Sequence, residues 1–132
     1  MKIYTTLIVS ATLVLTVSSC SKKDTPAPLT NECFADRLTF TQTAIRDYPT
    51  GHNVFITFDV KNTSSKDYDV DRGAKVITLK VDVSTTDSSH YETNVVFTKN
   101  SIAAGASATA MVSADYGAGK TFSGYNVIAV CY

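Results

Sequence analysis

Strict alternation of apolar and polar residues constrains this chain more than any other feature. The first alternating run covers residues 53–61, and its apolar positions are Val54, Ile56, Phe58 and Val60. The second covers residues 75–84, and its apolar positions are Ile77, Leu79, Val81 and Val83. Successive side chains of a strand point to opposite faces, so each run predicts a strand with one buried face. A helix would carry the intervening charges into its core.

Further runs predict strands over residues 91–97, 106–116 and 122–132, a short strand over 67–71 and a first strand within 36–47. For the first strand an alternative stays open, because Phe34 and Leu38 are four residues apart and would share a helical face. The run over 122–132 is apolar on both faces, so we expect it to be a central strand. Six turn segments rich in Gly, Asn, Asp, Ser and Pro separate the runs. About seven strands at this spacing predict a single all-β antiparallel sandwich of immunoglobulin-like type.

The N-terminus predicts export. Residues 1–19 contain Lys2 and then an apolar stretch that ends in small residues, which is typical of a secretory signal peptide. The stretch is too short and too rich in Thr and Ser for a membrane span. Val17, Ser18, Ser19 and Cys20 resemble the lipobox of bacterial lipoproteins. That resemblance implies cleavage before Cys20, which becomes the mature N-terminus, and attachment of a diacylglycerol to its sulfur through a thioether. The alternative is an ordinary signal peptide followed by a chance cysteine.

Residues 20–30 combine the predicted lipidated cysteine with a polar, proline-containing segment, and we expect a flexible tether there. Ser21 stands where inner-membrane lipoproteins often have aspartate, so the resemblance implies the outer membrane of the cell envelope. Residues 31–132 form the predicted sandwich domain. This domain has nine basic and eleven acidic side chains, a formal charge of −2, and no basic stripe, which argues against a nucleic-acid partner.

Two segments inside the domain resemble small immunoglobulin-like modules of bacterial envelope proteins. They are residues 56–64, with the strand end Val60-Lys61-Asn62-Thr63-Ser64, and residues 102–108, with a turn at Gly105. The resemblance implies a module that binds or spaces, and it brings no catalytic residues.

Cys33 and Cys131 lie near the two ends of the predicted domain. Terminal strands of a sandwich often lie close together, and an exported protein meets an oxidising compartment, so we expect a disulfide between them. Two buried free thiols are the alternative. A metal role is disfavoured because the two cysteines lack the spacing of a ligand set.

Three aspartates at every second position, Asp67, Asp69 and Asp71, project to one side if their segment is extended. Carboxylates are preferred ligands of Ca²⁺, so a calcium site is one interpretation, and no other cofactor is predicted. The glycine and the closing acidic residue of an EF-hand are misplaced here, however. An exposed edge strand with aspartates facing water is the other interpretation.

Catalytic signals are weak. His52 and His90 are isolated in the sequence, and no nucleophile or zinc motif surrounds them, so we expect no enzyme. The segment Gly117–Lys120 lacks the spacing of a phosphate-binding loop and predicts a hairpin turn. Several tyrosines would provide a binding face if they gathered on one sheet, although cross-strand packing is the simpler expectation. They are Tyr48, Tyr68, Tyr91, Tyr116 and Tyr125.

The sequence therefore predicts a protein attached to a membrane through lipidated Cys20, with a sandwich that binds an unidentified protein or glycan. Two other functions stay open. One is an inhibitor of secreted enzymes that inserts a loop such as Gly117–Lys120 into a cleft, and the other is a structural spacer in a surface assembly.

Overall fold

The computed structural model describes residues 27–28 and 31–132. The predicted signal peptide, Cys20 and most of the predicted tether lie outside these described residues. The described part forms strands and turns without a helix, so it holds no helix capable of crossing a membrane. The strands are β1 (Leu38–Tyr48), β2 (Asn53–Asn62), β3 (Tyr68–Asp69), β4 (Ile77–Thr85), β5 (His90–Val96), β6 (Ser101–Ile102), β7 (Ser107–Asp115) and β8 (Phe122–Cys131).

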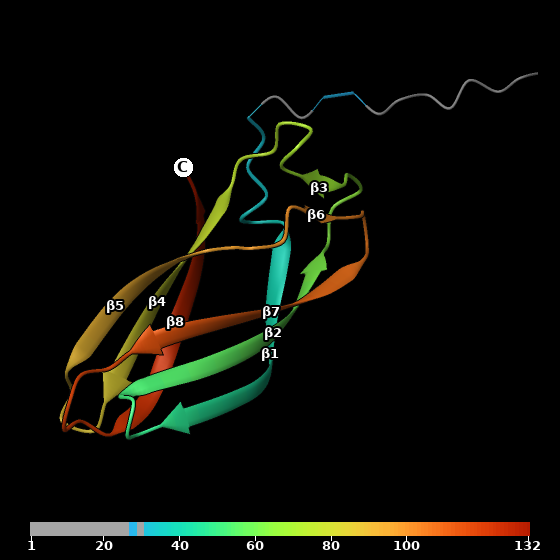
Figure 1. Cartoon of the computed structure of the whole chain (residues 1–132). Helices are drawn as coiled ribbons and strands as arrows, with labels where there is room; N and C mark the ends of the chain where they lie inside the picture. The colour runs from blue at the N-terminus through green and yellow to red at the C-terminus, as the bar shows by residue number, and fades with distance from the viewer. Residues whose placement is uncertain (1–26, 29–30) are drawn as a thin grey trace, which may run out of the picture.

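Two three-stranded antiparallel sheets make up the body, with strand orders β1-β2-β7 and β5-β4-β8 (Figure 1). Hairpins join β1 to β2 and β4 to β5, whereas the chain passes from one sheet to the other between β2 and β4, between β5 and β7, and between β7 and β8. The short pair β3-β6 lies at the end of the body where residues 27–28 are found. The all-β antiparallel sandwich is confirmed, while its immunoglobulin type stays a prediction.

The alternating runs supply the core. The even-numbered apolar residues of β2 and the odd-numbered ones of β4 are buried, and each of the two strands is the middle strand of its sheet. Phe34, Tyr68 and Phe97 close one end of this core; the Phe34 and Tyr68 rings lie 5.6 Å apart and the Tyr68 and Phe97 rings 6.1 Å apart. Sandwich cores of this kind form because two inner sheet faces bury their apolar side chains against each other.

Asn62 fixes the end of β2. Its side chain is fully buried, and its Nδ2 donates to the carbonyl oxygens of Lys66 and Ile102 at 2.7 and 3.0 Å. Its Oδ1 accepts from the backbone N–H and the hydroxyl of Ser64. A buried amide with every strong hydrogen-bonding group engaged holds the turn after β2 against β6.

Three expectations need correction or refinement. The expected count of about seven strands is refined to eight, because the two-residue β6, which no run predicted, pairs with β3, and the predicted strand 67–71 is itself only two residues long. The helical alternative for Phe34 and Leu38 is wrong, since residues 35–37 form a turn and Leu38 begins β1. The segment Gly117–Lys120 is not a hairpin turn, because it connects β7 to β8 in the opposite sheet.

The predicted central position of the last strand is also wrong. β8 pairs only with β4 and forms an edge of its sheet. Its inward side chains, Tyr125, Val127 and Ala129, pack against the core, but Ile128 on the outer face is 54% exposed. Apolar residues on both faces of this strand therefore reflect an uncovered outer face, and not burial on both sides.

Candidate binding surface

A groove of about 760 Å³ lies on the outer face of the β1-β2-β7 sheet. The strand register aligns its floor: Ala44, Thr57 and Met111 form one cross-strand row, and Arg46 faces Phe55 in the next row. The turn between β1 and β2 closes one end. The lining residues are Ala44, Ile45, Arg46, Tyr48, Thr50, Gly51, Asn53, Phe55, Thr57 and Met111. This volume is within the range of sites that hold small molecules or partner side chains.

Two aromatic rings form the apolar centre of the groove. The rings of Tyr48 and Phe55 meet edge to face, with centroids 5.2 Å apart and an interplanar angle of 79°. Met111 is 62% exposed, although it lies in the middle of β7. Aromatic and methionine side chains exposed together on a sheet face are typical of surfaces that contact a partner.

Arg46 is the charged residue among the groove-lining side chains. Its Nη1 donates to the hydroxyl of Tyr48 at 3.1 Å, and this hydrogen bond raises the pKa of the guanidinium. The bond holds the positive charge beside the aromatic pair. The groove therefore combines an apolar floor with one cation and with the hydroxyl and amide groups of Thr50, Thr57 and Asn53.

This groove was not predicted from the sequence. Phe55 stands alone among polar residues on the outer face of β2, and Met111 stands among Ser, Thr and Ala in β7. The signal at these two positions was a large apolar residue on a strand face that is otherwise polar. Tyr48 comes beside them only because the β1–β2 hairpin folds back on itself.

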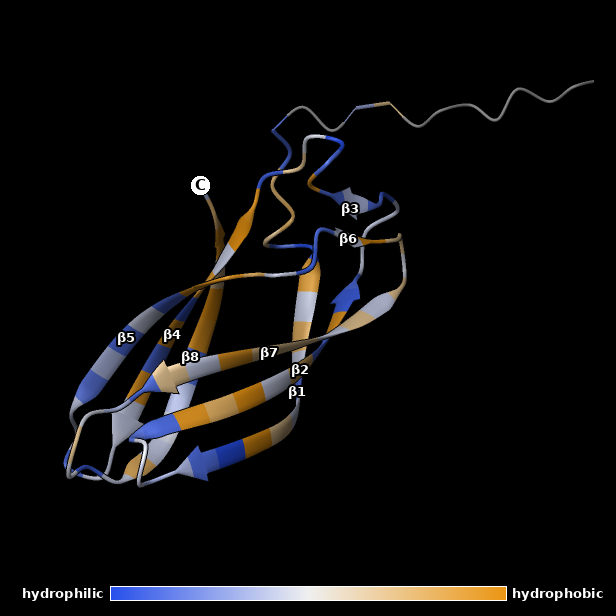
Figure 2. Cartoon of the chain, in the orientation of Figure 1, coloured by the Kyte–Doolittle hydropathy of each residue, from blue (hydrophilic) through white to orange (hydrophobic). Residues whose placement is uncertain are grey.

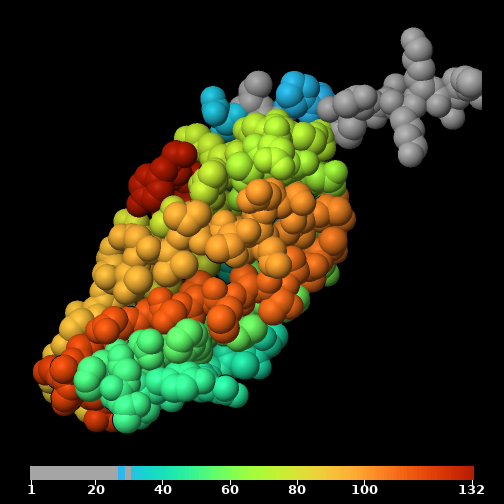
Figure 3. All heavy atoms as spheres, viewed as in Figure 1, coloured from blue at the N-terminus to red at the C-terminus, as the bar shows by residue number. Residues whose placement is uncertain are grey.

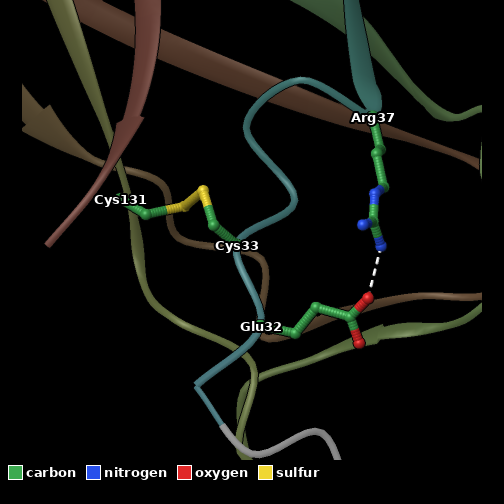
Figure 4. Close-up of a disulfide and its surroundings, with 4 residues drawn as sticks. All are labelled: Glu32, Cys33, Arg37 and Cys131. Atoms are coloured by element: carbon green, nitrogen blue, oxygen red, sulfur yellow. Dashed lines mark hydrogen bonds and ion pairs between the residues drawn. A yellow bond between two sulfur atoms is a disulfide. The ribbon is translucent and has the colours of Figure 1, made fainter.

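The predicted disulfide between Cys33 and Cys131 is present, with the two Cα atoms 5.8 Å apart (Figure 4). It joins the segment before β1 to the end of β8. In the same segment Glu32 pairs with Arg37, and Lys66 approaches the same carboxylate at 3.1 Å. The hydrogen bond from Arg37 is the main reason why the pKa of Glu32 is lowered. The N-terminal segment of the domain is therefore tied to the body covalently and by ion pairs.

Two of the three aspartates in the calcium interpretation, Asp67 and Asp69, have separate partners for their carboxylates. The carboxylate of Asp67 accepts the backbone N–H of Ala104 at 2.8 Å and lies 3.7 Å from the guanidinium of Arg72. The carboxylate of Asp69 accepts the backbone N–H groups of Asp71 and Arg72. Across residues 27–28 and 31–132, no three His, Cys, Asp or Glu side chains are grouped as metal ligands. The calcium site stays a prediction that this geometry does not support.

The two histidines belong to different elements, since His52 lies in the β1–β2 turn and His90 begins β5. His90 Nδ1 lies 3.0 Å from the carboxylate of Asp82 on the exposed outer face of the other sheet. His52 adopts a φ of 53° in the β1–β2 turn, and its carbonyl oxygen accepts the backbone N–H of Tyr116 at 2.9 Å. Neither histidine is among the groove-lining residues.

The five tyrosines do not gather on one face. Tyr68 and Tyr116 are fully buried, and the Tyr116 hydroxyl donates to Asp47 at 2.7 Å. Burial and this hydrogen bond together raise the pKa of Tyr116 to about 12, and burial is the larger of the two causes. The Tyr125 hydroxyl donates to Gln42 of the facing sheet. Only Tyr48 contributes to the groove.

Lys120, in the β7–β8 connection, forms an ion pair with Asp87 in the β4–β5 turn. The hydrogen bond from Lys120 is the largest of the effects that lower the pKa of Asp87. This loop, which the inhibitor interpretation would insert into a cleft, is thus held against the neighbouring turn.

Comparisons of the chain with protein-family models, with curated protein sequences and with solved structures give no match. The class that the fold defines is an all-β antiparallel sandwich closed by one disulfide.

Proposed function

We propose that this chain is a lipid-anchored protein of the cell envelope that acts by binding and not by turnover. The observation that carries the proposal is the sequence Val17-Ser18-Ser19-Cys20 at the end of an apolar leader. Two or three acyl chains on Cys20 provide stable attachment, because a single chain gives only reversible contact with a bilayer. Ser21 directly after the cysteine supports the outer membrane as the location.

The sandwich is the binding module. Attachment to a surface confines the domain to a thin layer, which raises its effective concentration toward partners in the same layer. The groove formed around Tyr48, Phe55 and Met111 supports a protein partner over a glycan, because aromatic, methionine and arginine side chains are enriched at protein interfaces. A disulfide suits this role, since it stabilises a small domain outside the cytoplasm.

The anchor is tested by fractionation of cells that express the full chain. The wild-type protein is expected in the membrane fraction, and Cys20→Ala is expected in the soluble fraction because it has no sulfur to carry the diacylglycerol. Thr25→Ala, in the same polar segment, serves as the matched control and stays with the membrane. Recovery of Cys20→Ala in the membrane fraction at the wild-type level contradicts the anchor.

The groove is tested by affinity capture from envelope extracts with the lipidated full chain in detergent. Met111→Lys adds a charge to the groove floor, and we expect this variant to capture at least tenfold less partner than the wild type. Asn94→Lys adds the same charge to the exposed outer face of the other sheet and is expected to retain it. Equal capture by both variants refutes the groove as the binding site, and capture of free glycans in place of a protein refutes the partner class.

A further inference from the structure

A second exposed apolar surface lies on the outer face of the β5-β4-β8 sheet. The pairings of Thr78 with Val96 and Val130, and of Lys80 with Ile128, place these side chains in adjacent rows. Val76 and Tyr132 flank the pair Ile77–Cys131 in the chain, and alternation along β4 and β8 assigns their side chains to the same face. We name this surface the end patch, and it consists of Val76, Val96, Ile128, Val130 and Tyr132.

The end patch is exposed and occupies only one half of the sheet. Val76 is 42%, Ile128 54%, Val96 57% and Tyr132 72% exposed. Figure 2 shows hydrophobic colouring at the start of β4 and the end of β8, which lie near the labelled C-terminus. The rows farther along the same face are polar, with Asp82 between Glu92 and Asn126. The outer face therefore changes from apolar to charged along the length of the strands.

The N-terminal segment of the domain joins the body at the apolar half. Asn31 donates its backbone N–H to Gly73 O, and Lys75 donates its backbone N–H to Glu32 O, both at 2.9 Å. The disulfide then fixes Cys33 to Cys131, the neighbour of Tyr132. In the space-filling view the blue N-terminal residues and the dark red C-terminus lie at the same end of the molecule (Figure 3).

The chain between this end and Cys20 is short. Arg72 Nη2 donates to the carbonyl oxygen of Ala27 at 2.9 Å, which holds that residue against the loop after β3. Six residues lie between Cys20 and Ala27, so seven Cα-to-Cα steps join them. Even fully extended, these steps span at most about 25 Å, which is less than the length of about 33 Å of a ten-residue strand. Acyl chains on Cys20 therefore keep the apolar half of the sandwich close to the bilayer.

The charges around the end patch suit an anionic surface. Lys75 precedes Val76, Lys80 lies opposite Ile128, and Lys99 follows Val96 by three residues. Between the rows of Lys80 and Val76 the outer face carries no acidic side chain on any of the three strands. Lysines around an apolar patch bind anionic headgroups while the apolar side chains enter the interface, where tyrosine is also favoured.

We propose that the end patch docks against the anionic lipid surface into which Cys20 is inserted. This docking deepens the proposed function and depends on the lipid anchor. It orients the domain, because the polar half of the β5-β4-β8 face and the β1–β2 turn beside the groove then lie farther from the membrane than the end patch does. Neighbouring copies and partner proteins would meet the groove in one fixed orientation.

The absence of tryptophan from the chain allows a direct test. Tyr132→Trp places a single reporter in the end patch, and Asn126→Trp places one on the same face of the same strand, in the polar half. Each lipidated full-length variant is reconstituted in vesicles of phosphatidylethanolamine and phosphatidylglycerol with brominated acyl chains. The Tyr132→Trp reporter is expected to lose most of its emission to bromine quenching, and the Asn126→Trp reporter is expected to lose little.

Val96→Asp combined with Ile128→Asp in the Tyr132→Trp background should restore the emission while the protein still floats with the vesicles. Flotation with an unquenched Tyr132→Trp reporter overturns the docking and leaves the anchor standing. Failure to float overturns the anchor and the docking together. An unquenched but blue-shifted reporter whose shift grows with protein density shows that a second copy covers the patch, which also overturns the proposal.

Discussion

Removal of the Cys33–Cys131 bridge is the perturbation whose effect on stability follows most directly from the fold. The bridge closes a loop with a sequence separation of 98 residues. In the chain-entropy model, removal of a cross-link that closes a loop of this length lowers the free energy of unfolding by about 4.7 kcal/mol. Typical domains have 5–15 kcal/mol in total, so the loss of this bridge leaves only a small reserve of stability.

Urea unfolding followed by near-ultraviolet circular dichroism of the tyrosines measures this loss. The double variant Cys33→Ala, Cys131→Ala avoids an unpaired thiol. At a slope of about 2 kcal/mol/M its midpoint should lie about 2 M below that of the oxidised wild type. Wild type treated with dithiothreitol should match the variant, and dithiothreitol should leave the variant unchanged. A loss of less than about 1 kcal/mol in both forms refutes the reasoning that the bridge acts on the unfolded chain.

Three further predictions concern single side chains. Asn62→Ala should lower the free energy of unfolding by roughly 2–3 kcal/mol in urea titrations, because it leaves buried backbone groups without partners. Gly117→Ala should lower the melting temperature more than Gly105→Ala. Both glycines have positive φ, which alone costs about 1 kcal/mol, but only at Gly117 would a Cβ lie 2.6 Å from the Tyr91 hydroxyl. Stability should fall between pH 10 and about 12, because folding raises the pKa of Tyr116 and the native state retains the proton that the unfolded state releases.

Each of these has a contrary outcome. Equal stability of Asn62→Ala and wild type means that water replaces the amide. Equal melting temperatures for the two glycine variants mean that the Tyr91 ring moves aside without cost. If Tyr116→Phe retains the full decline of stability above pH 10, another tyrosine causes it.

The sheet architecture was predictable where the hydrophobic pattern has one interpretation. β2 and β4 have an apolar residue at every second position, and each is buried on that face as expected. The pattern of β8 has two interpretations, since apolar residues on both faces occur in a central strand and in an edge strand with an uncovered apolar face. Strand order decides between them, and order depends on long-range pairing that the local pattern does not encode.

The groove was harder to predict for the same reason. Phe55 and Met111 are adjacent in space only because β2 and β7 pair in a particular register. The roles of the aspartates likewise depend on a distant loop, as Asp67 binds the backbone of Ala104, 37 residues away. The disulfide was predictable because only two cysteines lie in the domain, and the terminal strands of a sandwich often lie close together.

Lipid attachment at Cys20 can be measured by intact mass spectrometry of the protein extracted from the native envelope. We expect a chain of 113 residues that begins at Cys20, carries two or three acyl chains on that residue and contains one disulfide. An unacylated chain, or a chain whose N-terminus lies elsewhere, contradicts it.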